Sequence, residues 1–333
     1  MVDYSRIYDI IYALCAIGGR EQKLFGPYHP LAHEAFRRSM ASPDFPEIWF
    51  ELPLAGDPWF DLHVLTARES LDADMPFDPE TTGGNPAVFS WFARQDISKV
   101  RQLALSYDVH SAGIDEPAVQ LLVRTHTPET ICSFLQAAEN ETAAEAYRSF
   151  EKRLPDGWFC CYAGVFPSRK DFNLRVECIP DRGLERAYAQ DIALLERDLR
   201  QVGLCDFGET LLPRCQLLAQ SPYPLEFQLD ISPEGRALPT VSASVRFGAS
   251  PDDPDMPSFD PDGPAGELME RIESWGLADD RWRLLPETAF AKRVTRNGEE
   301  MVFYCYPAFI KLRWRNGEPV DAKTYLIAGH QPE

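Results

Sequence analysis

The sequence lacks the short motifs that mark the commonest nucleotide-, metal- and serine-dependent enzymes. Its 333 residues contain no G-x-x-x-x-G-K-[ST] loop, no G-x-G-x-x-G after a strand pattern, no H-E-x-x-H and no G-x-S-x-G. The six histidines are scattered, and only His29 and His33 share helical i, i+4 spacing. Pro30 places His29 before the helix, so the pattern does not predict a zinc site. Nothing in the chain predicts a phosphate loop, a dinucleotide site, a zinc protease site or a nucleophile elbow.

The chain also lacks paired cysteines and long apolar runs. None of its eight cysteines forms a C-x-x-C pair, and most of them lie in apolar runs, where cysteine behaves as a small hydrophobic residue. The apolar run Ile10–Ile17 follows acidic residues and fits an amphipathic helix better than a secretory signal. No segment approaches the length needed to span a bilayer. We expect a reduced, cytoplasmic protein.

Basic residues are scarce relative to acidic ones. Lys and Arg together number 33 against 52 Asp and Glu, which gives a net charge of −19. An acidic surface repels nucleic acid and anionic lipid, so we expect neither as a partner, and solubility alone would explain the excess acid. The length is compatible with two domains or with one large β-rich barrel, and we expect a single domain over residues 1–333.

What the chain has is a set of strands with one apolar and one polar face. In Leu225–Ile231, for example, Glu226, Gln228 and Asp230 alternate with apolar residues. Because side chains alternate across a strand, each such stretch buries one face and exposes the other to water. The clearest of these stretches are Asp171–Cys178, Leu225–Ile231, Thr240–Phe247, Ile310–Trp314 and Lys323–Ile327.

Helical patterns separate hairpins of such strands. We expect helices at Tyr4–Ile17, Pro30–Met40, Val88–Val100, 129–138, 142–153, Leu184–Val202 and Ala265–Trp275. The expected hairpins are Glu47–Leu54 with Trp59–Thr66, Leu103–Val109 with Ala118–Thr125, Trp158–Val165 with Asp171–Cys178, one from about Leu211 to Phe247, and Val302–Arg315 with Pro319–Ile327. The order is roughly αα-ββ, repeated about five times, which favours antiparallel pairing.

Two architectures fit this order: an open sheet covered by helices on one side, or a closed barrel. Ten strands make a long open sheet, whereas closure removes its exposed edges. We therefore expect an α+β fold in which about ten antiparallel strands close into a barrel with a polar lumen, surrounded by helices. Residues 248–266 form an acidic, proline-rich loop. Its Asp252-Asp253-Pro254-Asp255 cannot take the helical spacing that would gather aspartates around magnesium, so we expect no metal or other cofactor.

Several short segments resemble ABBA prenyltransferases, whose barrel has ten antiparallel strands inside a ring of helices. Ser111–Asp115, followed by Val119–Arg124 and Pro128-Glu129, resembles the second hairpin of the cyanobactin-type peptide prenyltransferases. Ala322–Leu326 resembles their last strand. Trp49-Phe50-Glu51-Leu52 is similar to the first barrel strand of the related indole prenyltransferases, in which a glutamate deprotonates the aromatic nucleophile.

The resemblance implies isoprenoid transfer from an allylic diphosphate to an aromatic or peptide side-chain acceptor. Such chemistry needs cations and hydroxyls for the diphosphate, aromatic walls for the allyl cation and a base for the acceptor. Glu51 would be the base, with a pKa raised by partial burial. The diphosphate ligands would be Arg175, Lys323, Tyr325, Arg246 and Lys311, and the aromatic walls Tyr304 and Tyr306.

The chain departs from the family where cations would be expected. Asp61 and His63 stand where an arginine is usual, Gln120 where a lysine is expected, and Asn173 beside Arg175 where two cations are implied. Each candidate also has an ordinary structural interpretation: Glu51 as a solvent-facing strand acid, Arg175 and Lys323 as members of cross-strand ion pairs, and the two tyrosines as a buried aromatic pair.

A second hypothesis therefore belongs to a different class. The barrel would have lost its diphosphate site and would bind a peptide or a partner protein, as an accessory factor in peptide modification. An acidic lumen should prefer basic ligands, and added salt should weaken that preference. A third interpretation is an open-faced α+β domain of unrelated function.

Overall fold

Twelve strands form one continuous antiparallel sheet in the part of the chain that the computed structural model describes, residues 24–26, 31, 34, 47–72, 74, 77–79, 82–167, 174–248, 258–296 and 299–332. In chain order they are β1 (Glu47–Pro53), β2 (Phe60–Ala67), β3 (Val100–His110), β4 (Gly113–Ile114), β5 (Ala118–Val123), β6 (Trp158–Val165), β7 (Leu174–Pro180), β8 (Leu225–Ile231), β9 (Ala237–Arg246), β10 (Phe290–Arg296), β11 (Glu299–Arg315) and β12 (Glu318–Pro332).

Ten of these strands close on themselves in the order β11–β12–β1–β2–β3–β5–β6–β7–β8–β9, and β9 pairs back with β11. The closing register sets Arg246 opposite Phe309 and Ser244 opposite Lys311. β11 is long enough to pair with β10 through its first half and with β9 through its second half. Closure pairs the backbone groups that an open sheet would leave exposed. The expected closed barrel is confirmed.

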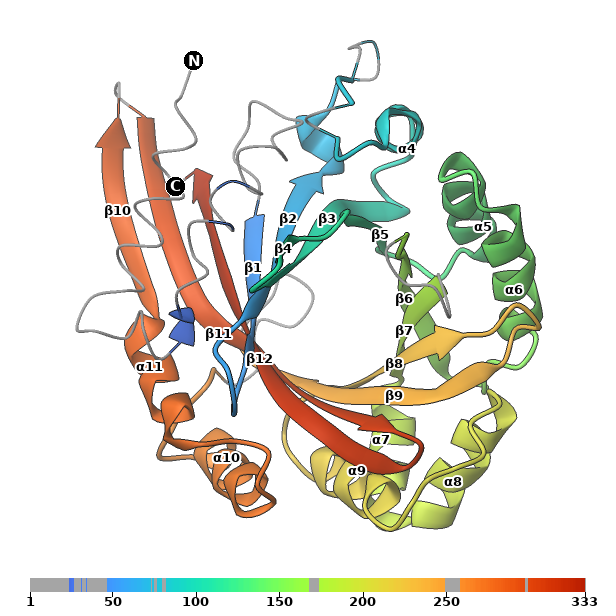
Figure 1. The fold of residues 1–333 in the computed structure, drawn as a ribbon, viewed down its shortest axis with the longest axis vertical. Coiled ribbons are helices and arrows are strands. Elements are labelled where there is room, and N and C mark those ends of the chain that lie inside the picture. Colours follow the sequence, from blue (N-terminus) through green and yellow to red (C-terminus); the bar gives the residue numbers. More distant parts are fainter. Residues whose placement is uncertain are drawn as a thin grey trace.

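Helices surround the barrel on its outside (Figure 1). In the described residues they are α4 (Pro86–Phe92), α5 (Pro128–Ala137), α6 (Glu141–Glu151), α7 (Arg182–Gln190), α8 (Ile192–Gln201), α9 (Leu211–Ala219), α10 (Pro264–Ser274) and α11 (Leu285–Thr288), with short 3₁₀ turns at Arg68–Ser70 and Asp280–Leu284. None of these helices combines the length and the apolarity that a bilayer crossing requires.

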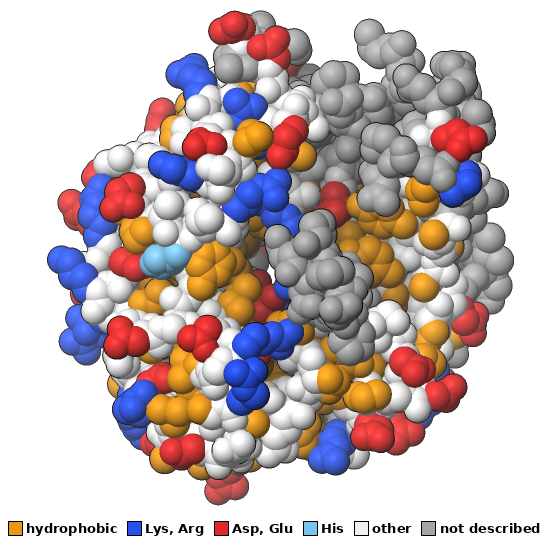
Figure 2. Space-filling model, turned by 180° about the vertical axis from the view of Figure 1, so that it is seen from behind, with side chains coloured by type: hydrophobic (Ala, Val, Ile, Leu, Met, Phe, Trp, Pro, Cys, Tyr) orange, Lys and Arg blue, Asp and Glu red, His pale blue; other side chains and the backbone are white. Residues whose placement is uncertain are grey.

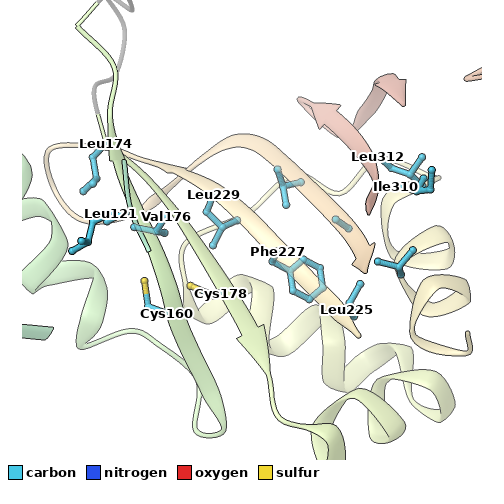
Figure 3. Close-up of a cluster of buried hydrophobic side chains, with 14 of the residues drawn as sticks. Leu121, Cys160, Leu174, Val176, Cys178, Leu225, Phe227, Leu229, Ile310 and Leu312 are labelled. Carbon is cyan, nitrogen blue, oxygen red and sulfur yellow. The ribbon is translucent and has the colours of Figure 1, made fainter. Parts of the chain in front are cut away.

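The hydrophobic core lies between the outer face of the barrel and this layer of helices. Leu225, Phe227 and Leu229 of β8 are fully buried there (Figure 3). Phe227 also stacks on Trp158, with ring centroids 5.1 Å apart. Burying a large aliphatic or aromatic side chain contributes about 1.5–3 kcal/mol. Since the apolar residues of each strand face outwards, the alternating polar residues must face the inside of the barrel.

Three expected elements, two helices and one hairpin, had the wrong bounds. The helix expected over Val88–Val100 ends at Phe92, and Val100 already begins β3. The long helix expected over Leu184–Val202 is broken into α7 and α8 at Asp191, whose side chain accepts hydrogen bonds from the backbone N–H groups of Ala193 and Leu194 and so caps a new helix.

The third error concerns the fourth hairpin, which was expected to start near Leu211. Leu211–Ala219 is instead the helix α9, and the two strands begin later, at Leu225 and Ala237. The helices expected at Tyr4–Ile17 and Pro30–Met40, and residues 249–257 of the acidic loop, lie outside the described residues, apart from Leu31 and Glu34.

Candidate active site

The inside of the barrel contains a cavity of about 470 Å³ lined mainly by polar and aromatic side chains. On the face shown in Figure 2 the surface is hollowed near its centre, with charged side chains bordering the hollow. The charged lining residues are Glu47, Glu51, Asp61, Asp108, Glu177, Glu226, Arg101, Arg124, Arg175, Arg246, Lys311, Arg313 and Lys323. The polar faces of the strands therefore share one enclosed space, as the barrel hypothesis requires.

Glu51 lies at the centre of a buried charge cluster. Its Oε1 is 2.5 Å from Nζ of Lys311 and 3.2 Å from Nζ of Lys323. Lys311 also donates to the hydroxyl of Tyr325 over 2.6 Å. Glu51 and Tyr325 are direct partners in the register of β1 and β12, and Lys311 and Lys323 in that of β11 and β12. Three adjacent strands thus bring the four side chains together.

This cluster reverses the pKa expected for Glu51. Burial alone would raise the pKa of its carboxyl group, but the ammonium groups of Lys311 and Lys323 and the hydrogen bond from His63 outweigh burial and hold the pKa well below its usual value. The expectation of a raised pKa was wrong, because the compensating lysines come from strands more than 250 residues away in the sequence. In this state Glu51 is an anion and a weak base.

His63 fixes the orientation of the Glu51 carboxylate. Its Nε2 lies 3.3 Å from Oε2 of Glu51, and its Nδ1 lies 2.6 Å from Oγ of Ser106. An ionised carboxylate only accepts hydrogen bonds, so Nε2 must be the donor in this pair. A neutral ring would then accept at Nδ1 from the Ser106 hydroxyl. Glu51 is therefore held on one side by two lysines and on the other by an imidazole.

Lys323 connects Glu51 to a second acid. Its Nζ is 2.8 Å from Oδ2 of Asp61 and lies 4.7 Å from the centroid of the Trp59 ring. Burial lowers the pKa of Lys323, but the carboxylates of Asp61 and Glu51 outweigh burial and raise it above the usual value. Burial also raises the pKa of Asp61. The ammonium group of Lys323 opposes this shift, and the carboxylates of Glu51 and Asp108 add to it.

Two arginines of the lumen, Arg175 and Arg246, also lie beside carboxylates. Arg175 of β7 makes a two-pronged contact with Asp230 of β8, through Nε at 2.6 Å and a terminal nitrogen at 3.2 Å. Arg246 lies 3.8 Å from Glu226, but its buried Nε makes no hydrogen bond within the described structure.

The sequence matches no family model and no curated protein. Solved structures do match its fold. 5-Dimethylallyltryptophan synthase from Streptomyces coelicolor is 10% identical, the alignment covers 96% of both chains, and the TM-score is 0.51. AnaPT from Neosartorya fischeri is 11% identical over 99% of this chain and 94% of its own, with a TM-score of 0.50. The chain has the ABBA prenyltransferase-barrel fold. At 10–11% identity these comparisons show a shared fold and do not extend to activity.

The five residues expected to bind the diphosphate all line the lumen of the ABBA barrel. Lys311, Lys323 and Tyr325 meet at Glu51. Arg175 and Arg246 also line the cavity, but each is paired with a carboxylate of β8 instead of with Glu51. Asp61, an acid at a position where the family would be expected to carry an arginine, pairs with Lys323. Asn173 lies outside the described residues.

The two tyrosines expected to wall the cation site have a different setting. Tyr304 and Tyr306 face each other with ring centroids 6.0 Å apart, and the Tyr304 hydroxyl donates to Glu47 over 3.2 Å. Only Tyr306 lines the cavity, and burial raises its pKa to about 12. They form an aromatic pair beside Glu47, which is four residues before Glu51 on β1.

The aromatic side chains beside Glu51 are others, which sequence reasoning missed. Trp49, Phe309 and Tyr325 pack together with centroid distances of 5.5 to 6.2 Å. Trp49 precedes Glu51 by two residues, and Phe309 precedes Lys311 by two residues. Since side chains alternate along a strand, this spacing was the signal that places them on the same inner face.

Proposed function

We propose that this ABBA barrel transfers an isoprenoid from an allylic diphosphate to an aromatic or peptide side-chain acceptor. One observation carries the proposal: in an enclosed lumen, a carboxylate, two lysines, a tyrosine hydroxyl and three aromatic rings meet around Glu51. These are the groups that the reaction needs in one place, a base for the acceptor, cations for the leaving group and π-faces for the allyl cation. The shared fold with 5-dimethylallyltryptophan synthase supports it.

The donor diphosphate would bind at Lys311 and Lys323, assisted by Tyr325. Both lysines contact Glu51 without a ligand, so the diphosphate oxygens must compete with that carboxylate. Charge-assisted hydrogen bonds to a diphosphate with several negative charges are stronger than those to one carboxylate. Arg246, which lines the same cavity, would provide a further donor.

This exchange of partners would activate the base. When the lysines turn to the diphosphate, Glu51 loses the two neighbouring charges that lower its pKa, while its burial remains. Its pKa then rises, and the carboxylate becomes able to accept a proton. Donor binding would thus prepare Glu51 for the acceptor, and without donor the base would stay inactive.

The reaction would begin with heterolysis of the carbon–oxygen bond between the allyl group and the diphosphate. The diphosphate leaves with the electron pair, and the allyl cation lies against the rings of Trp49, Phe309 and Tyr325, which stabilise it without bonding to it. An electron pair of the acceptor forms the new bond to the allyl carbon. The proton that the acceptor loses passes to Glu51. The enclosed cavity limits capture of the cation by water.

The test is incubation of the full chain with dimethylallyl and geranyl diphosphate and a panel of tryptophan, tyrosine and short peptides, with products followed by mass spectrometry. Calorimetry with the same diphosphates measures donor binding. Lys311→Met should weaken donor binding at least tenfold, whereas Lys99→Met removes a lysine that is exposed outside the lumen and should change it less than twofold. Absence of diphosphate binding at millimolar ligand would remove the proposal.

A second candidate function is binding of a peptide or partner protein without transfer. The observation that favours it is the pairing of cations in the lumen: Arg175, Arg246, Lys311, Arg313 and Lys323 each lie within 4 Å of a carboxylate. In a protein that never binds diphosphate, these cations would stay paired with their carboxylates. Binding of basic peptides by a chain that calorimetry shows to ignore diphosphates would favour this function over transfer.

A further inference from the structure

We propose that Arg101 and Arg124 form a subsite at one end of the lumen that binds the terminal carboxylate of a linear peptide acceptor. The inference rests on the proposed function only in giving the bound peptide the role of acceptor. Binding of the carboxylate is a separate property of the lumen and can be measured without donor.

A β-bulge in β3 turns Arg101 into the lumen. Leu103 and Leu105 point into the outer core, so regular alternation along the strand would send Arg101 there as well. The register between β3 and β5 shifts between Val100 and Gln102, and beyond this shift Val100 lies in the outer core while Arg101 lines the cavity. Bulges commonly re-aim a side chain beside a site. Here the bulge brings a cation to the inside of the barrel.

The guanidinium group of Arg101 has no anionic partner in the described part of the chain. It makes no hydrogen bond and no ion pair there, and the side chain is partly exposed, so a ligand in the cavity can reach it. The lumen acid Glu47 already accepts hydrogen bonds from the indole of Trp49 over 2.5 Å and from the hydroxyl of Tyr304 over 3.2 Å. Arg101 is therefore available to an anion that enters the lumen.

Arg124 adds a second guanidinium at the same end. Its backbone N–H donates to the carbonyl of Lys99 over 2.8 Å, which holds the end of β5 against the start of β3, and its side chain also lines the cavity. Arg124 pairs with Glu69 over 3.0 Å, but both side chains are more than 40% exposed. Exposed ion pairs of this kind contribute little, so a ligand can replace Glu69 at small cost.

Tyr306 supplies a hydroxyl near the same guanidinium. Burial and the carboxylate of Glu47 raise the pKa of Tyr306 to about 12, and the positive charge of Arg101 opposes this rise, which places Arg101 near the Tyr306 ring. Tyr306 lines the cavity. Two guanidinium groups and a phenol hydroxyl thus surround one end of the lumen, and all of them can donate hydrogen bonds to an anion.

A carboxylate suits this end better than the donor diphosphate does, although both offer anionic oxygens. The planar fork of a guanidinium matches the two oxygens of a carboxylate. In the registers of β1, β2 and β3, Glu51 lies opposite Asp61 and Asp61 opposite Asp108. Arg101 precedes Asp108 by seven residues, about 23 Å of strand. A diphosphate held by the lysines at Glu51 would not reach Arg101.

The same separation determines the length of the acceptor. A single amino acid carries its carboxylate next to its own side chain, so it cannot place its ring at Glu51 and its carboxylate at Arg101. The long side chain of Arg101 and the ring of the acceptor cover part of the distance. At about 3.3–3.6 Å per extended residue, about three residues of peptide cover the rest. The acceptor is therefore a linear peptide whose reacting side chain lies about three residues before its free end.

The experiment is calorimetry of the full chain, without diphosphate, with the N-acetylated peptide Trp-Gly-Gly-Gly as the free acid and as the terminal amide. We expect the acid to bind at least tenfold more tightly, a difference of about 1.4 kcal/mol. Arg101→Gln should reduce this preference to less than twofold, and Arg124→Gln should reduce it about threefold. Arg94→Gln removes an exposed arginine outside the cavity lining and should leave it unchanged. N-Acetyl-tryptophan should prefer the acid over the amide less than threefold.

Equal binding of acid and amide, or a preference that persists in Arg101→Gln, would overturn the subsite. A preference of N-acetyl-tryptophan as large as that of the peptide would place the carboxylate beside the ring and would also overturn it. Thermal unfolding checks that each variant is folded, and Arg101→Lys, which keeps the charge, should retain at least a threefold preference.

Inorganic pyrophosphate, titrated in parallel, tests the donor site separately. Its Kd should change less than twofold in Arg101→Gln, and a larger loss would assign Arg101 to the donor and overturn the subsite. A chain that ignores pyrophosphate but prefers the peptide acid through Arg101 would retain the subsite and lose the proposed transfer, so the two failures give different results.

Discussion

At the scale of the residue, the behaviour of this lumen depends on Glu51. A buried carboxylate without partners would be neutral, but two lysines and a histidine make Glu51 an anion. The same contacts give it two incompatible roles, counter-ion for the lysines and base for the acceptor. Donor binding separates the roles in time, because a diphosphate can replace the carboxylate at the lysines.

Glu51→Gln tests both roles at once. The amide cannot accept the acceptor proton, so we expect the transfer rate to fall by about 10²–10⁴-fold, the usual contribution of general base catalysis. The amide also leaves Lys311 without its counter-ion and Lys323 with Asp61 alone, so inorganic pyrophosphate should bind more tightly than to the unchanged protein. Steady-state kinetics and calorimetry measure the two effects. A variant that loses transfer and pyrophosphate binding together would instead show that Glu51 only maintains the structure.

Glu226 provides a prediction on pH. Burial and the neighbouring carboxylate of Glu177 raise the pKa of Glu226 well above its ordinary value of 4.5. Between that value and the raised pKa the folded state holds a proton that the unfolded state has lost, so stability falls as the pH rises through this window. Glu226→Gln has no such proton to lose. The melting temperature of the variant minus that of the unchanged protein should therefore increase from about pH 5 to about pH 8.

Differential scanning fluorimetry over this range provides the measurement. Glu234→Gln, an exposed acid of the turn between β8 and β9, is the matched control and should show a constant difference. A difference for Glu226→Gln that stays constant with pH would contradict the prediction.

At the scale of the element, strands were easier to predict than helices. Period-two alternation identified β8 and β9, since one apolar and one polar face leave no other interpretation. The helix α9 was missed because Leu211–Ala219 is short, mostly apolar and contains Pro213. Its buried residues Leu211, Cys215 and Leu218 do have the i, i+4, i+7 spacing of a helix.

The charged residues of the candidate site could be placed on inward faces from the sequence, but their pairing and the aromatic residues beside Glu51 could not. Alternation alone placed Glu51, Lys311 and Lys323 on inward faces, given a barrel. Which carboxylate each cation meets depends on contacts between distant segments: Arg175 and Asp230 are 55 residues apart, and Lys323 and Asp61 are 262 apart. Sequence reasoning therefore left open whether Arg175 and Lys323 bind a ligand or form cross-strand ion pairs, and in the described structure both are paired with a carboxylate.

The break between α7 and α8 gives a prediction for a helix cap. The Asp191 side chain accepts hydrogen bonds from Ala193 N at 2.9 Å and Leu194 N at 3.3 Å. Asp191→Ala should lower the free energy of unfolding by about 0.5–2 kcal/mol, and Asp191→Asn, which can still cap, should restore most of that loss. Urea unfolding followed by circular dichroism measures it. Equal stability of the alanine and asparagine variants would show that the cap contributes nothing.

At the scale of the whole molecule, closure between β9 and β11 determines what the charges can do. An open sheet would expose the polar faces to water, where ion pairs contribute little. The barrel encloses them, and buried pairs are then screened much less by salt. The chain as a whole carries a net charge of −19, so its outer field attracts cations towards a lumen whose β1–β3 wall is acidic.

This field predicts the salt dependence of ligand binding. The screening length falls from about 30 Å at 10 mM salt to about 8 Å at 150 mM, so attraction from outer charges disappears while the contacts of a basic ligand inside the lumen remain. We expect the Kd of N-acetyl-arginine amide to rise at least threefold between 10 and 300 mM sodium chloride and then to level off. The Kd of N-acetyl-citrulline amide, which keeps the shape of arginine without its charge, should stay within a factor of 1.5. Calorimetry across this series provides the measurement. A dependence that continues unchanged to 1 M would place the cation on the outer surface, and no dependence would mean that the negative charge of the molecule plays no part in selecting its ligand.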